Sequence, residues 1–300
     1  MIIKNAIIFK TVQELLKKDN PTQEDLLSIK ELDLQRKNLT EVNDLEIFVN
    51  LEKLNLTENC LSDLNSIKDL IHLKELRAGN DPFISDEEKA NRKGKNHFVN
   101  YSFLENLKNL THVCFTDTDI DNVDFVCMLP NVIEFWAYCN PLKSIDPIIL
   151  CQKLKKAYFY ACTQINDISV CKKIPSLDGL AINATGVSDI SPLCEHNNFI
   201  YLDAHDAKIR DISPVKNMVE MIYLTLAGNF VTDITPLLKM QKMKSLTLEI
   251  KDYLTFDQID KILPELKGLK TVELNNCDFT KEQEKELKSK MPYINWDIYR

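Results

Sequence analysis

Glycine is scarce in this chain, and so are the residue arrangements that mark cofactor or metal sites. The 300 residues include six glycines, and these do not cluster, which excludes a glycine-rich phosphate loop. No two of the nine cysteines form a Cys-x-x-Cys pair, and no His-Glu-x-x-His sequence occurs. We therefore expect that the protein holds neither a metal ion nor a cofactor.

Long apolar runs are missing as well. No stretch approaches the roughly 18 uninterrupted apolar residues that a membrane helix needs. The apolar start of the chain is interrupted at Lys4 and Asn5 and lacks a small-residue cleavage site, so we interpret it as a packed cap rather than a signal peptide. An odd number of cysteines without an export signal favours reduced thiols. These features predict a cytoplasmic protein, and secretion by a non-classical route stays open.

The charge balance is acidic. The formal net charge is -8 and the isoelectric point is near 5.3. A mostly acidic surface repels nucleic acid and anionic membranes. We expect a monomer that binds neither nucleic acid nor membrane, and whose partner is another protein.

A pattern of the form Leu-x-x-Leu-x-Leu-x-x-Asn-x-Leu recurs along most of the sequence, usually every 22 residues. It predicts an α/β leucine-rich-repeat solenoid of about 11 repeats, a curved right-handed superhelix. In this fold the Leu-x-Leu residues form a parallel concave sheet, and short helical or 3-10 segments form the convex side. The repeats begin at Ile29, Leu51, Leu73, Leu110, Val132, Leu154, Leu177, Phe199, Met221, Met243 and Leu269.

The ninth position of each repeat is expected to point inward, where an Asn or Cys side chain bonds loop backbone groups that would otherwise be buried without partners. The residues at this position are Lys37, Asn59, Asp81, Thr118, Asn140, Cys162, Thr185, Ala207, Asn229, Lys251 and Cys277. Cys162 and Cys277 are accordingly predicted to be structural. Four more cysteines fall on convex segments, where we expect buried small hydrophobic residues rather than a metal site: Cys127, Cys151, Cys171 and Cys194.

One phrase follows three of the strands, as DISPL at residues 189–193, DISPV at 211–215 and DITPL at 233–237. It resembles the convex-side phrase of internalin-like repeats, the 22-residue class also found in a protein-phosphatase regulatory subunit. The resemblance covers about residues 20–300 and implies a general scaffold for protein recognition. It leaves two specialised roles open, as a regulatory subunit of a phosphatase-like enzyme and as an exported effector or adhesin.

Three segments are expected along the chain. Residues 1–28 form a helical cap, residues 29–279 the repeat array, and residues 280–300 a cap with a helix and a final strand. Thr280 has the signature of a helix N-cap, and residues 256–263 also have helical spacing. A charged insertion around residues 81–100 interrupts the array, and it either assists binding or is a solvated elaboration.

The outward positions of the strands carry the candidate binding site. Aromatic side chains crowd the middle of the predicted concave face, and Tyr and Trp are enriched at binding hot spots. We predict that the partner-binding residues are Glu134, Trp136, Tyr138, Lys156, Tyr158, Tyr160, Tyr201, Asp203, His205 and Tyr223. Gly179 and Ala181 are expected to leave a shallow hollow between Tyr158 and Asp203. The alternative is that tyrosine simply tolerates exposure on a strand.

An enzyme is the remaining alternative. His112 with Cys114, or His205 with Asp203 and Asp206, could form part of a nucleophile or base arrangement. An open surface excludes little water and offers no evident oxyanion donors. We therefore expect no catalytic residues, and we predict a non-enzymatic scaffold or inhibitor that binds its partner on the concave face.

Overall fold

The computed structural model describes residues 3–91 and 93–300, which form two compact units. Unit 1 comprises Met1–Pro141 and Leu150–Leu154, and unit 2 comprises Leu142–Ile149 and Lys155–Arg300. Residues 1 and 2 of the predicted N-terminal cap and residue 92 of the predicted insertion lie outside the described residues. The units are described one after the other.

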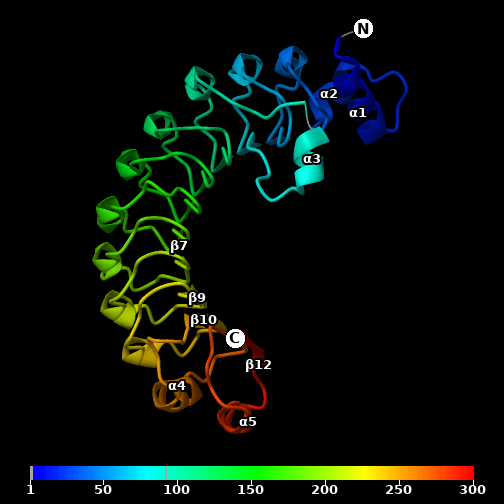
Figure 1. The fold of residues 1–300 in the computed structure, drawn as a ribbon. Helices are drawn as coiled ribbons and strands as arrows, with labels where there is room; N and C mark the ends of the chain where they lie inside the picture. The colour runs from blue at the N-terminus through cyan, green and yellow to red at the C-terminus, as the bar shows by residue number, and fades with distance from the viewer. Residues whose placement is uncertain (1–2, 92) are drawn as a thin grey trace. The chain divides into compact units, whose positions relative to one another are not determined.

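The described residues of unit 1 form five parallel strands that pair in chain order, in the part of the chain that runs from blue to green in Figure 1. They are β1 (Glu31–Asp33), β2 (Lys53–Asn55), β3 (Glu75–Arg77), β4 (His112–Cys114) and β5 (Glu134–Trp136). The pairing aligns the third position of every repeat, so that Glu31 lies beside Lys53 and Glu75 lies beside His112. The last pairing holds across the insertion, which confirms the predicted repeat register on both sides of it.

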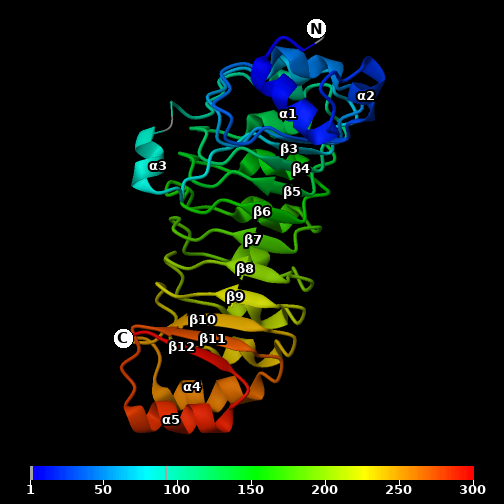
Figure 2. The ribbon, with the colours of Figure 1, turned by 90° about the vertical axis from the view of Figure 1, so that its right-hand side faces the viewer.

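Unit 2 contains seven parallel strands in chain order, visible in Figure 2 as a regular stack. They are β6 (Lys156–Tyr158), β7 (Gly179–Ala181), β8 (Tyr201–Asp203), β9 (Tyr223–Thr225), β10 (Ser245–Glu249), β11 (Thr271–Asn275) and β12 (Asn295–Ile298). β12 pairs with β11, so the predicted closing strand is confirmed.

Five helices are described. In unit 1 they are α1 (Ala6–Leu16), α2 (Gln23–Ser28) and α3 (Asp86–Asn91), and in unit 2 they are α4 (Phe256–Ile262) and α5 (Lys281–Lys290). Thr255 and Thr280 each form a capping box with the glutamine three residues later, which sets the start of α4 and α5 where the sequence predicted helices. Within the described residues, no helix is long and apolar enough to cross a membrane.

The repeats cross back from the strands through short 3-10 segments. Three of these begin at the Ser-Pro or Thr-Pro step of the repeated phrase: Ser191–Leu193, Ser213–Asn217 and Thr235–Lys239. Proline suits the first turn because it fixes φ and has no N–H to satisfy. The preceding aspartate accepts the free N–H, as Asp211 Oδ1 does from Ser213 at 2.7 Å. The Asp-Ile-Ser/Thr-Pro phrase therefore sets where each of these three 3-10 segments begins.

The core lies between the strands and these segments. Leu54, Leu56, Leu180 and Ile182, at the fourth and sixth positions of their repeats, are at most 1% exposed. The predicted leucine-rich-repeat solenoid fold is confirmed by this burial pattern and by the strand register.

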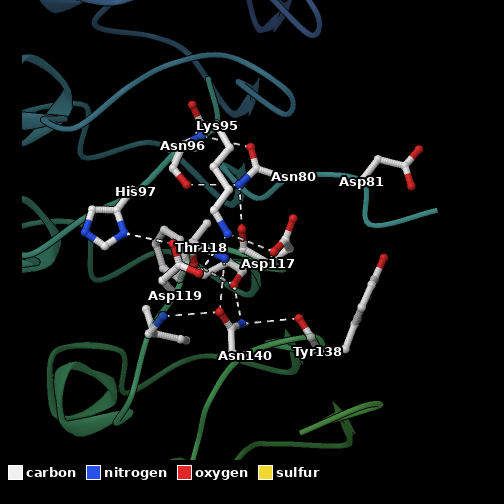
Figure 3. Close-up of polar contacts among 12 residues, drawn as sticks. Asn80, Asp81, Lys95, Asn96, His97, Asp117, Thr118, Asp119, Tyr138 and Asn140 are labelled. Carbon is white, nitrogen blue, oxygen red and sulfur yellow. Dashed lines mark hydrogen bonds and ion pairs between the residues drawn. The ribbon is translucent and has the colours of Figure 1, made fainter. Parts of the chain in front are cut away.

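Buried polar side chains at the ninth repeat position form a ladder within each unit, in which asparagines bond their own repeat and the one before it. Asn140 donates from Nδ2 to Ala137 O in its own repeat and to Phe115 O in the preceding one, while its Oδ1 accepts from Thr118 N and Ile120 N (Figure 3). Asn59 and Asn229 make the same type of bonds. Thr118 replaces asparagine with one bond, from Oγ1 to Phe115 O at 2.8 Å.

In the third repeat, the prediction that Asp81 belongs to this ladder is wrong. Asp81 lies in the insertion, and the ladder position is occupied by Asn96, which is fully buried. Asn96 Nδ2 donates to Leu56 O and Ala78 O, and its Oδ1 accepts from Leu61 N at 3.0 Å. The insertion therefore enters between the strand and the ladder residue, and the ladder resumes after it.

Asn96→Ala is expected to lower the free energy of unfolding by about 2–4 kcal/mol, because four backbone groups lose a partner: Leu61 N and the carbonyls of Leu56, Ala78 and Gly79. Asp81→Ala removes a half-buried carboxylate that pairs with Arg36 at the surface, and it is expected to cost less than about 1 kcal/mol. Urea unfolding followed by circular dichroism would compare them. Equal costs would contradict the placement of Asn96 in the ladder.

Four of the six cysteines that were predicted to be structural or buried are buried, and two are exposed. Cys162 and Cys277 are buried at the ladder positions as predicted, and Cys151 and Cys171 are also buried. The expectation that Cys127 and Cys194 are buried is wrong, since both are exposed. In a 3-10 segment, side chains three residues apart lie on the same side. Cys127 comes three residues after the exposed Asp124, and Cys194 comes three residues after the exposed Ser191, so both cysteines face outward.

Candidate partner-binding surface

The strands present alternate side chains to solvent, and we call the outward side chains at the third, fifth and seventh repeat positions the sheet face. The three-residue strands β4, β5, β6 and β8 each have two half-buried outward residues around one buried residue. Three predicted site residues lie on the sheet face of unit 1 and seven on that of unit 2. The two groups are treated separately.

In unit 1 the predicted aromatic residues pack against neighbours on the same face. The Trp136 ring stacks on His112 of the adjacent strand, with centroids 6.1 Å apart and planes 27° apart. The Tyr138 ring stacks on Phe83 with a centroid separation of 6.2 Å. Phe83 belongs to the insertion and is 64% exposed. The structure thus adds to this group an aromatic residue that the sequence prediction missed.

Ion pairs tie the insertion to the repeats on either side. Arg36 in the first repeat contacts Asp81 at 3.2 Å, and Lys95 contacts Asp117 at 3.0 Å and Asp119 at 2.7 Å (Figure 3). Between these anchors, α3 stands to the side of β3, β4 and β5 (Figure 2). The only sequence signal for the role of Phe83 is an aromatic residue in an otherwise charged segment.

In unit 2 the predicted hollow between Tyr158 and Asp203 is absent, so that prediction is wrong. The rings of Tyr158 and Tyr201 approach to 6.1 Å, although their strands flank β7 and would be nearly 10 Å apart if the side chains stood upright. Ala181 is 3% exposed, and a Cβ on Gly179 would lie 3.0 Å from Lys156 Cγ. The small residues of β7 make room for their neighbours to lean over them.

The same arrangement recurs one position further along. Tyr160 and His205 have ring centroids 6.4 Å apart, and between them in the repeat lies Asn183, which is 5% exposed. Burial raises the pKa of Tyr201 above its usual value. Among the predicted tyrosines of unit 2, Tyr223 is the most exposed, at 48%. The other predicted aromatic side chains are therefore half-buried by one another.

Asp203 and His205 form the main charged contact of this group. His205 Nδ1 lies 2.9 Å from Asp203 Oδ1, and Thr225 Oγ1 also donates to that oxygen. The bond to Asp203 raises the pKa of His205 above its ordinary value, against the effect of partial burial. Burial pushes the pKa of Asp203 upward, but the bonds from His205 and Thr225 outweigh it, so the pKa is lowered overall. The pair is charged over a wider pH range than the free groups.

The Asp203–His205 contact is expected to be pH-dependent. Because the folded pKa of His205 is raised above 6.5, its contribution to stability is fully present below pH 6.5 and lost as pH rises through the folded pKa. A chemical-shift titration should place the His205 pKa above 6.5, and Asp203→Asn should lower it. His205→Gln assigns the resonance among the five histidines. A His205 pKa that Asp203→Asn leaves unchanged would contradict the pairing.

His112 and Cys114 do not form a nucleophile and base. His112 Nδ1 lies 2.9 Å from Thr111 Oγ1 and its ring packs on Trp136, while Cys114 Sγ lies 3.2 Å from Thr116 Oγ1. Burial raises the pKa of the Cys114 thiol, which therefore stays protonated at neutral pH. In the described part of the chain, no group of three or more His, Cys, Asp or Glu residues could hold a metal ion.

Native alkylation tests the state of Cys114. Iodoacetamide at pH 7.5 is expected to modify Cys114 roughly ten-fold more slowly than the exposed Cys127 and Cys194, because both thiolate fraction and access are reduced. Peptide mass spectrometry gives the rate at each cysteine, and labelling in urea provides the fully reactive control. If Cys114 reacts faster than Cys127, the thiol is activated and an enzymatic role must be reconsidered.

The repeat register, the parallel strands and the buried ladder define a leucine-rich-repeat protein. Among solved structures, the chain is similar to an internalin (InlF) of Listeria monocytogenes, with 21% identity, a TM-score of 0.69, and coverage of 99% of this chain and 95% of that one. The functional domain of InlJ from the same organism has a TM-score of 0.70 at 16% identity, over 98% of this chain and 58% of that one. Internalin C2 of that organism is 24% identical, with a TM-score of 0.55, over 82% and 94% of the two chains. The resemblance to internalins is thus confirmed at the level of fold. No protein-family model and no curated protein sequence matches the chain.

Proposed function

We propose that this protein is a non-enzymatic scaffold or inhibitor that binds a partner protein through the sheet face of its repeats. The observation that carries the proposal is the set of half-buried aromatic side chains on that face. Trp136 and Tyr138 present such rings in unit 1, and Tyr158, Tyr160 and Tyr201 present them in unit 2. Because they already pack in pairs, they lose little side-chain freedom when a partner covers them.

The insertion takes part in this proposed surface. Phe83 is fixed at one end of its segment by the Arg36–Asp81 ion pair and stacks on Tyr138. An exposed aromatic ring held in place at the edge of other aromatic rings is suited to contact a partner. This favours binding over solvation as the role of the insertion.

We further propose that the chain acts as a monomer in the cytoplasm. All nine cysteines are free thiols, including the exposed Cys127 and Cys194. Free exposed thiols persist in reducing compartments and are oxidised outside them.

Two double variants would test the proposed surface, one in each unit. Phe83→Ala with Trp136→Ala removes rings from unit 1, and Tyr158→Ala with Tyr201→Ala removes rings from unit 2. A partner is first captured from lysate with the unaltered protein and identified by mass spectrometry, and its affinity for each variant is then measured. Truncation of a hot-spot residue costs about 2 kcal/mol or more, so at least one variant should bind about 30-fold more weakly.

The matched control is Val219→Ala with Leu238→Ala, which removes exposed apolar side chains away from the sheet face. It should leave the affinity unchanged, and circular dichroism should show that all variants are folded. Unchanged affinity in both aromatic variants, or equal loss in the control, would overturn the proposed site.

A further inference from the structure

A cavity of about 660 Å³ lies on the sheet face of unit 2, at the end of strands β8 to β11. Its lining includes four carboxylates: Asp203, Asp206, Glu249 and Glu273. Neither lysine nor arginine is among the lining residues. A volume of this size is within the range of about 300–1,000 Å³ that binding pockets occupy.

The acidic character extends over the whole face of these repeats. From β8 to β12, the third, fifth and seventh positions include Asp203, Glu249, Glu273 and Asp297, and none of the chain's 37 Lys and Arg residues. The face of unit 1 differs, since Lys53 and Arg77 stand beside acidic residues there and pair with Glu31 and Glu75. Among the described outward residues of β8 to β12, no lysine or arginine stands beside these carboxylates.

Two of the four carboxylates in the lining are held by hydrogen bonds from the protein. Glu249 Oε2 accepts from Gly228 N at 3.0 Å, and Asp203 accepts from His205 and Thr225. Within the described residues, Glu273 accepts no hydrogen bond, and the nearest basic group to Asp206 is His205 Nε2 at 3.9 Å. Two carboxylates are therefore fixed by the protein, while two others can accept bonds from a ligand.

Gly228 keeps this site open. Its φ is +69°, and a Cβ added there would lie 2.0 Å from Asp206 Oδ1. Any side chain at this position would displace the Asp206 carboxylate. Tyr299 also lines the cavity and is 55% exposed, so it offers an aromatic ring on which a guanidinium group can stack.

We propose that this cavity binds an arginine-bearing segment of the partner protein. The inference rests on the proposed function, because Asp203 and His205 belong both to the cavity and to the predicted binding site. Tyr201 precedes them on β8, so a protein that covers this ring extends into the cavity. Arginine suits the lining because its planar fork bonds carboxylates in pairs and stacks on tyrosine.

The test uses the peptide Ac-Gly-Arg-Arg-Gly-NH2 and the same peptide with citrulline in place of arginine, which is similar in shape but neutral. Binding to the full chain is followed by the chemical shifts of His205 at low salt. We expect the arginine peptide to saturate the shift at millimolar concentration and to lower the His205 pKa, since a cation would lie beside the imidazole. The citrulline peptide should bind at least ten-fold more weakly.

Asp206→Asn with Glu273→Gln should weaken the arginine peptide at least ten-fold. Asparagine tolerates the positive φ of 51° at position 206, so this variant is expected to fold. The control Glu195→Gln with Glu265→Gln makes the same change in net charge away from the sheet face and should bind as the unaltered protein does. Equal weakening in both variants would show general charge attraction and overturn the proposal.

Spermidine distinguishes a small polyamine from a peptide. If it binds as tightly as the arginine peptide and competes with it, the cavity is a small-cation site and the proposal is overturned. No shift of His205 at millimolar arginine peptide would also overturn it. A partner that the Asp206→Asn and Glu273→Gln variant binds normally, but that the aromatic variants lose, would refute the cavity proposal while leaving the proposed function intact.

Discussion

The fold depends on buried backbone groups that no single repeat can satisfy. When the chain turns from the strand into its return segment, carbonyl and N–H groups point into the core. The asparagine of the next repeat reaches back to them: Asn140 bonds both Phe115 O and Thr118 N of the preceding repeat. Each polar side chain thus makes two repeats interdependent, and the 22-residue spacing follows from the need to place the next donor at the same height. Thr118 in the same position makes one such bond from its side chain, to Phe115 O, and Ala207 has no polar side chain to make any.

This requirement explains how the insertion is tolerated. The ladder needs an asparagine in the right place, not a fixed number of residues before it. Asn80 accepts from Asn96 N and donates to Asn96 O, so the chain leaves and re-enters the core at one point. In the segment between them Ile84 is buried, while Asp81 and Lys95 hold the segment to the repeats through ion pairs with Arg36, Asp117 and Asp119. The insertion, with α3, therefore lies beside the strands of unit 1, and the pairing of β3 with β4 keeps its register.

Much of the fold could be predicted because the same sequence pattern recurs in many repeats, and each copy fixes the alignment of its strand. The positions of the strands, of α4 and α5, and of the last strand follow from apolar periodicity and capping residues. The ladder residue of the third repeat could not be predicted by counting forward from Leu73, because the insertion lies between them. Counting back 22 residues from Thr118 leads to Asn96. The packing of the sheet face was beyond reach for another reason. Whether Tyr158 and Tyr201 stand apart or lean together over β7 depends on side-chain rotamers and on the volume above Gly179, and neither is encoded in a single column of residues. The contact between Phe83 and Tyr138 was also beyond reach, because Phe83 lies in the insertion and has no position in the repeat from which its neighbours could be counted.

The two kinds of sheet-face chemistry differ in what they contribute to binding. In the proposed complex, paired aromatic rings such as Tyr158 with Tyr201 would offer apolar area, and its burial would set how long a partner stays bound. In the proposed complex, the carboxylates around the β8–β11 cavity would act at longer range than the rings, and salt would weaken their effect on the approach and selection of a partner. His205 belongs to both, because it packs on Tyr160 and bonds Asp203. The hydrogen bond to Asp203 is the main cause of its raised pKa, and the charges of Asp206 and Glu273 add to it, so the His205 pKa depends on both parts of the face.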